Sequence, residues 1–291
     1  MVANSDAEDH LAGRDLRHTR LRDYRLDGAD LSRCILRGTD LRGTDLHGAN
    51  LTGANLEGAN LAGVDLHGAR LEHTVLTWAN LKGAQLGSAD LRDGHLHGAD
   101  LCNADLHDAD LDHADLGDAA VRGTDLRGAR LTWARLSGAD LKQAEASTAD
   151  LAHAHLDGAH LTETRMTAAR FGEADLSGAT LAGADLSGAG LQGARLRGIT
   201  MGLSSRQDPV NLEGADLAGA DLRDARLSSV SLTGADLRGA DLSGASAFNV
   251  ELTDAHWDGS TRWDYHHALQ IRDASVPWQG GYRVARRYVM R

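Results

Sequence analysis

Histidines and carboxylates are the side chains of this 291-residue sequence that could do chemistry. Three of its 15 histidines, His47, His67 and His107, each follow an Asp-Leu pair. Their spacing in multiples of twenty would place them on one face of a structure with a twenty-residue period, where stacked imidazoles beside carboxylates could bind zinc weakly. Solvated surface histidines are the simpler interpretation, and no sequence-local Cys or His cluster of the usual zinc type is present. We therefore expect no metal site and no cofactor.

The motifs of common enzyme classes are also missing from the sequence. It has no G-x-S-x-G nucleophile motif, no phosphate-binding loop and no dinucleotide fingerprint between a strand and a helix. Its 34 glycines recur instead with a short repeat. A core filled by that repeat leaves no concave pocket for a small-molecule substrate, so we expect a protein that is not an enzyme.

Acidic residues follow the same twenty-residue spacing as the three histidines. The series consists of Asp45, Asp65, Asp105, Asp125, Glu145 and Asp185. On a coil of that period these side chains would form an acidic ladder, which is the candidate partner-binding surface. Asp and Asn also satisfy backbone groups in turns, so a purely local role for these residues stays open.

The element that must position these residues is a five-residue repeat. From Leu11 to Met201 an inward-type residue returns at 39 consecutive positions, of which 34 are Leu. Ala usually stands two residues before it, Asp or Asn one before, and Gly two after. A period of five fits neither the helix nor simple strand alternation, so the chain must turn once per repeat. Gly would supply the positive φ of a type II turn.

The residues two before each leucine indicate how many turns complete a coil. One series at twenty-residue spacing is alanine throughout, from Ala29 to Ala189, whereas another includes Thr44, Val64 and Thr124. A twenty-residue coil with four unequal sides explains this difference. Cys34 and Cys102 would then lie more than three coils apart, too far to form a disulfide, which favours a reducing cytoplasm.

The register breaks once, after Met201, and resumes from Leu212 to Trp257. If residues 204–209 are an inserted corner loop of six, Ala215, Ala235 and Ala255 rejoin the all-alanine side. Arg206 and Asp208 are then predicted to be the exposed contacts of that loop.

The A-(D/N)-L-x-G motif over residues 11–257 resembles the pentapeptide repeat family. This resemblance implies an all-β solenoid, a right-handed quadrilateral β-helix of about 12 coils with Leu and Ala pointing inward. At a coil spacing of about 4.8 Å it would be roughly 58 Å long. We expect a lead-in at residues 1–10, the β-helix at 11–257 and a capping or dimerisation segment at 258–291.

The C-terminal segment differs in composition from the repeats. Its candidate capping or dimer residues are Trp263, Tyr265, Leu269, Trp278, Tyr282 and Tyr288. We expect one helix from Asp264 to Arg272 and another from Tyr282 to Arg291, with a hinge at Gly280-Gly281. The family resemblance favours a homodimer joined through this segment, and a monomeric cap stays open.

Charge narrows the choice of partner. The net charge is −12, made up of +3 for residues 258–291 and −15 for the rest. Such an acidic surface argues against direct binding of nucleic acid or anionic membranes. The sequence also has no apolar stretch long enough to span a membrane, and its first ten residues are too polar for a signal peptide. We expect a cytoplasmic protein.

The resemblance also implies a function. Some pentapeptide repeat proteins act as DNA mimics toward type II topoisomerases such as DNA gyrase, inhibiting the enzyme or protecting it from quinolones and other poisons, and loops on their coils contribute to protection. The acidic ladder suits such a protein partner. The alternative is a structural scaffold with an unrelated partner, because the fold does not dictate the function.

Overall fold

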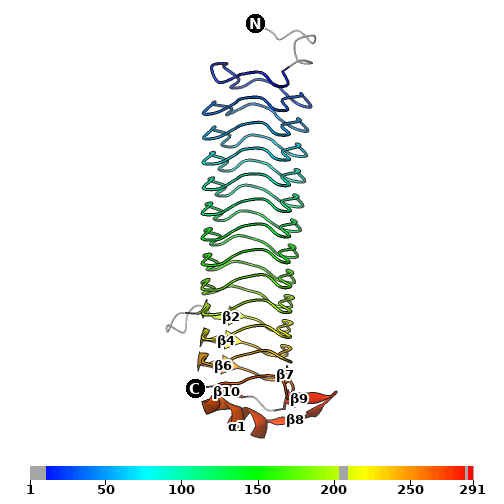
Figure 1. The fold of residues 1–291 in the computed structure, drawn as a ribbon, viewed down its shortest axis with the longest axis vertical. Coiled ribbons are helices and arrows are strands. Elements are labelled where there is room, and N and C mark those ends of the chain that lie inside the picture. The colour runs from blue at the N-terminus through cyan, green and yellow to red at the C-terminus, as the bar shows by residue number, and fades with distance from the viewer. Residues whose placement is uncertain (1–10, 203–208, 286–287, 291) are drawn as a thin grey trace. The chain divides into compact units, whose positions relative to one another are not determined.

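The computed structural model describes residues 11–202, 209–285 and 288–290, without the side chains of Tyr265 and His266. The chain divides into two compact units, Met1–Glu145 and Ala146–Arg291. Both units are built from stacked coils, which Figure 1 shows edge-on.

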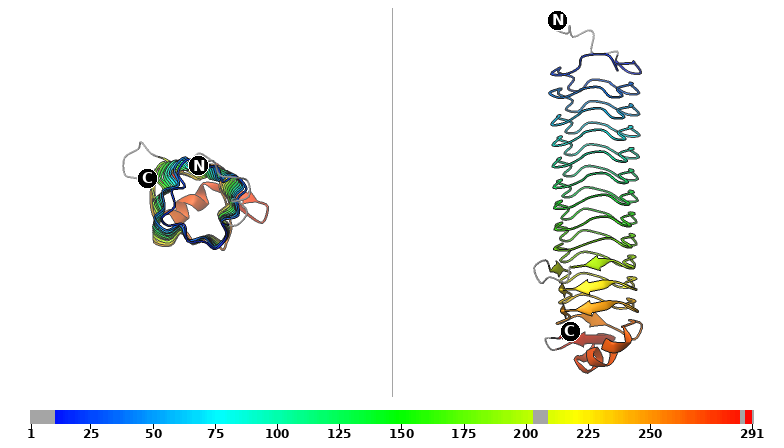
Figure 2. Two further views of the ribbon diagram at one scale, coloured as in Figure 1. Left: turned by 90° about the horizontal axis from the view of Figure 1, so that it is seen from above. Right: turned by 90° about the vertical axis from the view of Figure 1, so that its left-hand side faces the viewer.

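A coil of either unit contains twenty residues. The residue before an inward leucine typically forms a parallel β-bridge with the residue twenty positions later, as in Asp45 with Asp65 and Asn60 with Asn80. Beside each bridge the leucine N–H donates to the following coil, for example from Leu46 to the carbonyl of Asp65 at 2.9 Å. Because bridges recur every five residues, a coil has four sides, as the view from above shows (Figure 2).

Each corner of a coil is a β-turn closed by the inward leucine. The Ala49 N–H donates to the Leu46 carbonyl at 3.0 Å, and Gly48 between them has a φ of 63°. Trp78 and Thr148 occupy the same turn position with φ of 59° and 62°. The left-handed conformation expected of glycine is therefore imposed on other residue types as well.

The core is a column of Leu and Ala side chains, most of them completely buried. Threonine replaces the inward alanine at some positions, and its hydroxyl is then satisfied by the backbone. The Thr124 hydroxyl donates to the Leu101 carbonyl at 2.7 Å, and the Thr44 hydroxyl donates to the Leu21 carbonyl at the same distance. Within the described residues, the buried Thr39 hydroxyl has no such partner.

In the second unit the register shifts by six residues after Met201, and by one more residue at the end, where Asp241 bridges Arg262 at an offset of 21. Asp185 bridges Asn211, and strand β1 (Thr200–Met201) pairs in parallel with β3 (Arg226–Ser228), each at an offset of 26. Strand β2 (Val210–Asn211) then pairs with β4 (Val230–Ser231) at an offset of 20. The coil that contains the first shift therefore has six residues more than a coil of twenty. The predicted loop contacts, Arg206 and Asp208, lie outside the described residues.

Two further strands continue these pairings toward the C-terminus. Strand β5 (Ser246–Phe248) pairs in parallel with β3, and β6 (Val250–Glu251) pairs in parallel with β4. Strand β7 (His256–Trp257) follows on the next side of the coil.

The C-terminal segment closes the end of the second unit. It contains helix α1 (Tyr265–Asp273) and strands β8 (Ser275–Trp278), β9 (Gly281–Val284) and β10 (Val289–Met290). Strand β9 lies antiparallel between β7 and β8, and β10 lies antiparallel to β6. Strands β9 and β10 thus pair with the last coil, and Figure 1 shows α1 beneath it.

Helix α1 lies within one residue of the predicted span, but the second predicted helix, from Tyr282 to Arg291, is wrong. Strands β9 and β10 occupy that region because the last coil leaves backbone N–H and C=O groups that an added strand can satisfy. Burial of Val284 and Met290 favours the same pairing. Gln279 and Gly280, both with positive φ, form the turn between β8 and β9 in place of the predicted hinge.

Candidate partner-binding surface

The structure brings five of the six predicted ladder residues together in the first unit. Consecutive parallel bridges connect Asp45, Asp65, Gln85, Asp105, Asp125 and Glu145, which we call the acidic column. Adjacent members are separated by about 4.8 Å, the spacing of paired strands. Asp185 belongs to the second unit, where it bridges Arg165 and Asn211.

Carboxylates of the acidic column also support the turns that follow them. The backbone N–H groups of His47 and His67 donate to Oδ1 of Asp45 and Asp65 at 3.1 and 3.0 Å. His107 makes the same contact with Asp105 at 3.1 Å. The local role that the sequence left open is therefore present, and it engages one oxygen of each carboxylate.

Basic residues neutralise the acidic column unevenly. The Arg127 guanidinium donates to both carboxylate oxygens of Asp125, with Nε 2.9 Å from Oδ1, and this bonding lowers the Asp125 pKa. Arg25 approaches Asp45 only to 3.9 Å. Asp65 and Asp105 have no arginine at ion-pair distance within the described residues.

The three predicted histidines line the acidic column. The rings of His47 and His67 are stacked with their centroids 5.5 Å apart, and those of His67 and His107 are 6.0 Å apart across Gly87. A Cβ at Gly87 would lie 2.4 Å from a carbon of the His107 ring, so a larger residue there would displace the ring. His107 Nδ1 lies 2.7 Å from Asp105 Oδ1, and this hydrogen bond raises the His107 pKa.

Metal binding by the histidines finds no support in this geometry. Among the residues that the structure describes, no group of three or more His, Cys, Asp or Glu side chains is placed to hold a metal ion. Cys34 and Cys102, both in the first unit, are free thiols, and Cys34 is buried.

Arginine-aspartate forks like that of Arg127 and Asp125 also occur on other sides of the coils. Arg42 and Arg92 fold back onto Asp40 and Asp90, two residues earlier, with Nε to Oδ1 distances of 2.9 and 2.8 Å. The hydrogen bonds that Arg17 donates to Asp15 lower the pKa of the Asp15 carboxyl to about 2. The D-L-R pattern of the sequence accompanies these pairs, although we did not predict them from it. The forks compensate part of the acidic charge locally.

The predicted capping residues pack mainly within the chain. Trp257 stacks on Tyr282 at 4.4 Å and meets Trp263 edge-on at 6.0 Å. The Tyr288 hydroxyl donates to Gln270 at 2.9 Å. The Leu269 side chain on α1 is 72 % exposed, while the side chain of Tyr265 lies outside the described residues.

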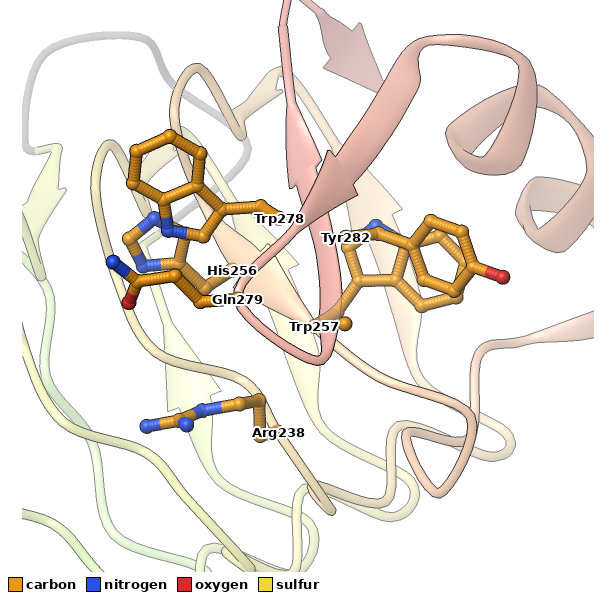
Figure 3. Close-up of a pocket in the computed structure, with 7 residues that line it drawn as sticks. Arg238, His256, Trp257, Trp278, Gln279 and Tyr282 are labelled. Carbon is orange, nitrogen blue, oxygen red and sulfur yellow. The ribbon is translucent and has the colours of Figure 1, made fainter.

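A shallow pocket of about 70 Å³ lies beside this cap (Figure 3). The ring of Trp278 stacks on His256 at 6.1 Å, and the Arg283 guanidinium lies 4.7 Å from the Trp278 ring centroid. Trp278 is still 40 % exposed. The lining residues are Arg238, His256, Trp257, Trp278, Gln279, Gly281 and Tyr282.

Two exposed tryptophans of the first unit, Trp78 and Trp133, are absent from the predicted site residues, yet they are 63 % and 49 % exposed. The signal that could have found them is a tetrapeptide, L-T-W-A, that occurs at both positions with Trp where the repeat favours Gly.

Comparisons with known proteins agree with the repeat geometry. The pentapeptide repeat family model matches residues 10–43, 39–77, 79–118, 104–143, 147–181, 164–201 and 210–246. A search of curated proteins finds no match. None of the described helices is long and apolar enough to cross a membrane.

Similar solved structures include HetL, a pentapeptide repeat protein involved in heterocyst differentiation regulation in the cyanobacterium Nostoc, at 38 % identity over 72 % of this chain and 89 % of that one, with a TM-score of 0.44. QnrB1, a plasmid-mediated fluoroquinolone resistance protein, matches at 17 % identity over 91 % of this chain and 98 % of its own, with a TM-score of 0.25. On the evidence of the repeats and the family match, this chain belongs to the pentapeptide repeat family.

Proposed function

We propose that this protein is a non-enzymatic binding protein that presents the acidic column to a basic protein surface which normally holds duplex DNA. Its partner is a type II topoisomerase such as DNA gyrase, which it inhibits or protects from quinolones and related poisons. The observation that carries the proposal is the bridged alignment of Asp45, Asp65, Asp105, Asp125 and Glu145.

The physical argument is electrostatic complementarity. Regularly spaced carboxylates on a rigid backbone attract a lysine- and arginine-rich surface without a conformational change in the binding protein. Asp65 and Asp105 lie beside the stacked histidines and have no arginine partner among the described residues. Their hydrogen bonds from His67 and His107 use Oδ1, which leaves Oδ2 of each carboxylate for a basic group of the partner. Because exposed charges are screened by salt, the interaction should weaken as ionic strength rises.

The test removes charge from the acidic column without removing the turn contacts. Asp45→Asn, Asp65→Asn and Asp105→Asn, combined in one variant, keep an oxygen that accepts the turn N–H. We expect inhibition of gyrase supercoiling, or rescue of supercoiling from ciprofloxacin, to require at least about tenfold more of this variant, equivalent to about 1.4 kcal/mol of lost binding.

A matched control changes three aspartates on another side of the same unit. Asp40, Asp100 and Asp140 lie on one line of bridges, and their Oδ1 atoms accept the equivalent turn N–H groups. Changing these three to Asn alters the net charge equally and should preserve the effect on gyrase. The topoisomerase proposal would be refuted if the wild-type protein at micromolar concentration produced no inhibition of gyrase and no rescue from ciprofloxacin.

A scaffold with an unrelated partner is the second candidate. It is favoured by the arginine-aspartate forks, because these make several sides of the coils a mixed-charge surface suited to ordinary protein contacts. Absence of any effect of the wild-type protein on gyrase would favour this candidate, whereas equal loss in both triple variants would show that the acidic column is not the surface that acts on gyrase.

We also propose that two chains associate through the C-terminal segment. The exposed Leu269 and Trp278 side chains support this, since most other aromatic residues of the segment are already packed against their own chain.

A further inference from the structure

Trp78 occupies a turn position at which the repeat favours glycine. It lies at a coil corner with a φ of 59°, where a side chain is strained, and its surface is 63 % exposed. The same corner of the neighbouring coils carries Gly58, Gly98 and Asp118, at positions that differ by multiples of twenty. A strained and exposed tryptophan is explained more readily by a contact outside the chain.

The indole ring is held flat against the next coil. A Cβ on Gly98 would lie 2.2 Å from a carbon of the Trp78 ring, so the ring covers this glycine. His97 meets the ring edge-on, with the two centroids 5.5 Å apart. One face of the indole therefore packs on the protein while much of the side chain remains open to solvent.

A carboxylate stands beyond Gly98 on the same corner. The Asp118 side chain is 67 % exposed, and its Oδ2 lies 3.9 Å from His97 Nε2. In the described part of the chain, a cation–π contact joins Arg283 to Trp278, and no cation lies over the Trp78 ring. Asp118 lies two coils beyond Trp78, with Oδ1 over Gly138. An open aromatic face with a carboxylate farther along the same corner is a setting that attracts a guanidinium or ammonium group.

We propose that Trp78, His97 and Asp118 form a docking point for an arginine or lysine side chain of a partner protein. The cation lies over the open face of the Trp78 indole, and the Asp118 carboxylate offsets its charge. A net charge of −12 favours a basic partner. This docking point lies on a different corner from the acidic column and does not depend on the identity of the proposed topoisomerase.

The experiment uses the full chain labelled with 5-fluorotryptophan, titrated with a hexa-arginine peptide at physiological salt and followed by fluorine NMR. The Trp78 signal is identified by its loss in Trp78→Phe. We expect this signal to shift and saturate with hexa-arginine and not with uncharged hexa-citrulline. Asp118→Asn should weaken the binding seen at Trp78 by about two- to fivefold, because an exposed ion pair contributes about 0.5–1 kcal/mol.

Two glycine variants separate ring orientation from backbone strain. Gly98→Ala places a Cβ where the ring lies, whereas Gly58→Ala has the same left-handed turn position with open space around its Cβ. We expect Gly98→Ala to weaken peptide binding at Trp78 and Gly58→Ala to leave it unchanged, with circular dichroism confirming that both fold. An unmoved Trp78 signal at saturating peptide, or equal binding in the two glycine variants, would overturn the proposal.

Discussion

Individual threonines show how this core accommodates polar groups. The inward alanine position is completely enclosed, yet Thr124 fits because its hydroxyl donates to the Leu101 carbonyl of another coil. Thr39 occupies the equivalent position with no hydrogen-bond partner among the described residues. Two residues of the same type therefore have opposite energetic consequences, because an unmade buried hydrogen bond costs more than an average one contributes.

Replacing each threonine by valine tests this difference. Val64 already fills an inward position of the same kind and is buried. We expect Thr124→Val to lower the free energy of unfolding by about 1 kcal/mol, whereas Thr39→Val should leave it unchanged or raise it. Urea denaturation of both variants makes the measurement, and an equal loss in the two would contradict the assigned hydrogen bonds.

At the residue scale, the sequence predicted which side chains are buried but not which hydrogen bonds the buried threonines make. The five-residue spacing was enough to identify Leu46 or Leu131 as inward, because any other direction would expose the whole series. Nothing near Thr39 or Thr124 in the sequence distinguishes the two, since the carbonyl that accepts the Thr124 hydrogen bond belongs to another coil. The flat packing of Trp78 on Gly98 is hidden for the same reason.

Among the elements, the corner turn is the one that repeats most strictly. It keeps the left-handed φ even when the residue is β-branched, as Thr148 shows. The hydrogen bonds on both sides of a corner, such as Thr148 N–H to the Thr167 carbonyl at 2.9 Å, hold that conformation. Side-chain preference is thus overruled by the stacking of coils.

The free-energy cost of the left-handed conformation for a β-branched residue can be measured by exchanging glycine and threonine between two corners of the second unit. We expect Thr148→Gly to raise the free energy of unfolding by about 0.5–1 kcal/mol by relieving strain. Gly158→Thr should lower it by about 1–2 kcal/mol, although its Cβ meets nothing within 4 Å. The two melting temperatures should move in opposite directions, and a shift of both in one direction would contradict the strain argument.

The prediction of secondary structure was wrong for the second helix of the C-terminal segment, where the repeat ends. Tyr282 to Arg291 contains residues compatible with a helix, and the sequence alone gives no measure of the unpaired backbone that the last coil presents. Antiparallel pairing of β9 with β7 and of β10 with β6 satisfies that backbone. Such long-range pairing is invisible to local propensity.

For the molecule as a whole, the dominant electrostatic property is a large set of aspartates with lowered pKa values. The causes are arginine side chains, as for Asp90 and Asp236, and hydrogen-bond donors of the following turn, as for Asp30. The Asp15 pKa falls to about 2. These carboxylates bind protons more weakly in the folded than in the unfolded chain.

The protein should consequently lose stability in acid. A depressed folded-state pKa contributes stability that is complete above the unfolded value of about 4 and disappears as pH falls toward the folded values. We expect the urea midpoint to be nearly constant from pH 7 to 5 and to drop steeply between about pH 4 and 2. A midpoint that stays level down to pH 2.5 would show that these contacts do not contribute to folding.

The twenty-residue bridge offset has a consequence for how the gene can change in length. Gain or loss of twenty codons would leave every outward residue in line with its former neighbours. A change of five codons would keep every leucine inside but move all later side chains to the adjacent side, which would cut the line of carboxylates from Asp45 to Glu145. Mutation can thus abolish recognition while sparing folding, so relatives that differ by one repeat are expected to share an architecture and not a partner.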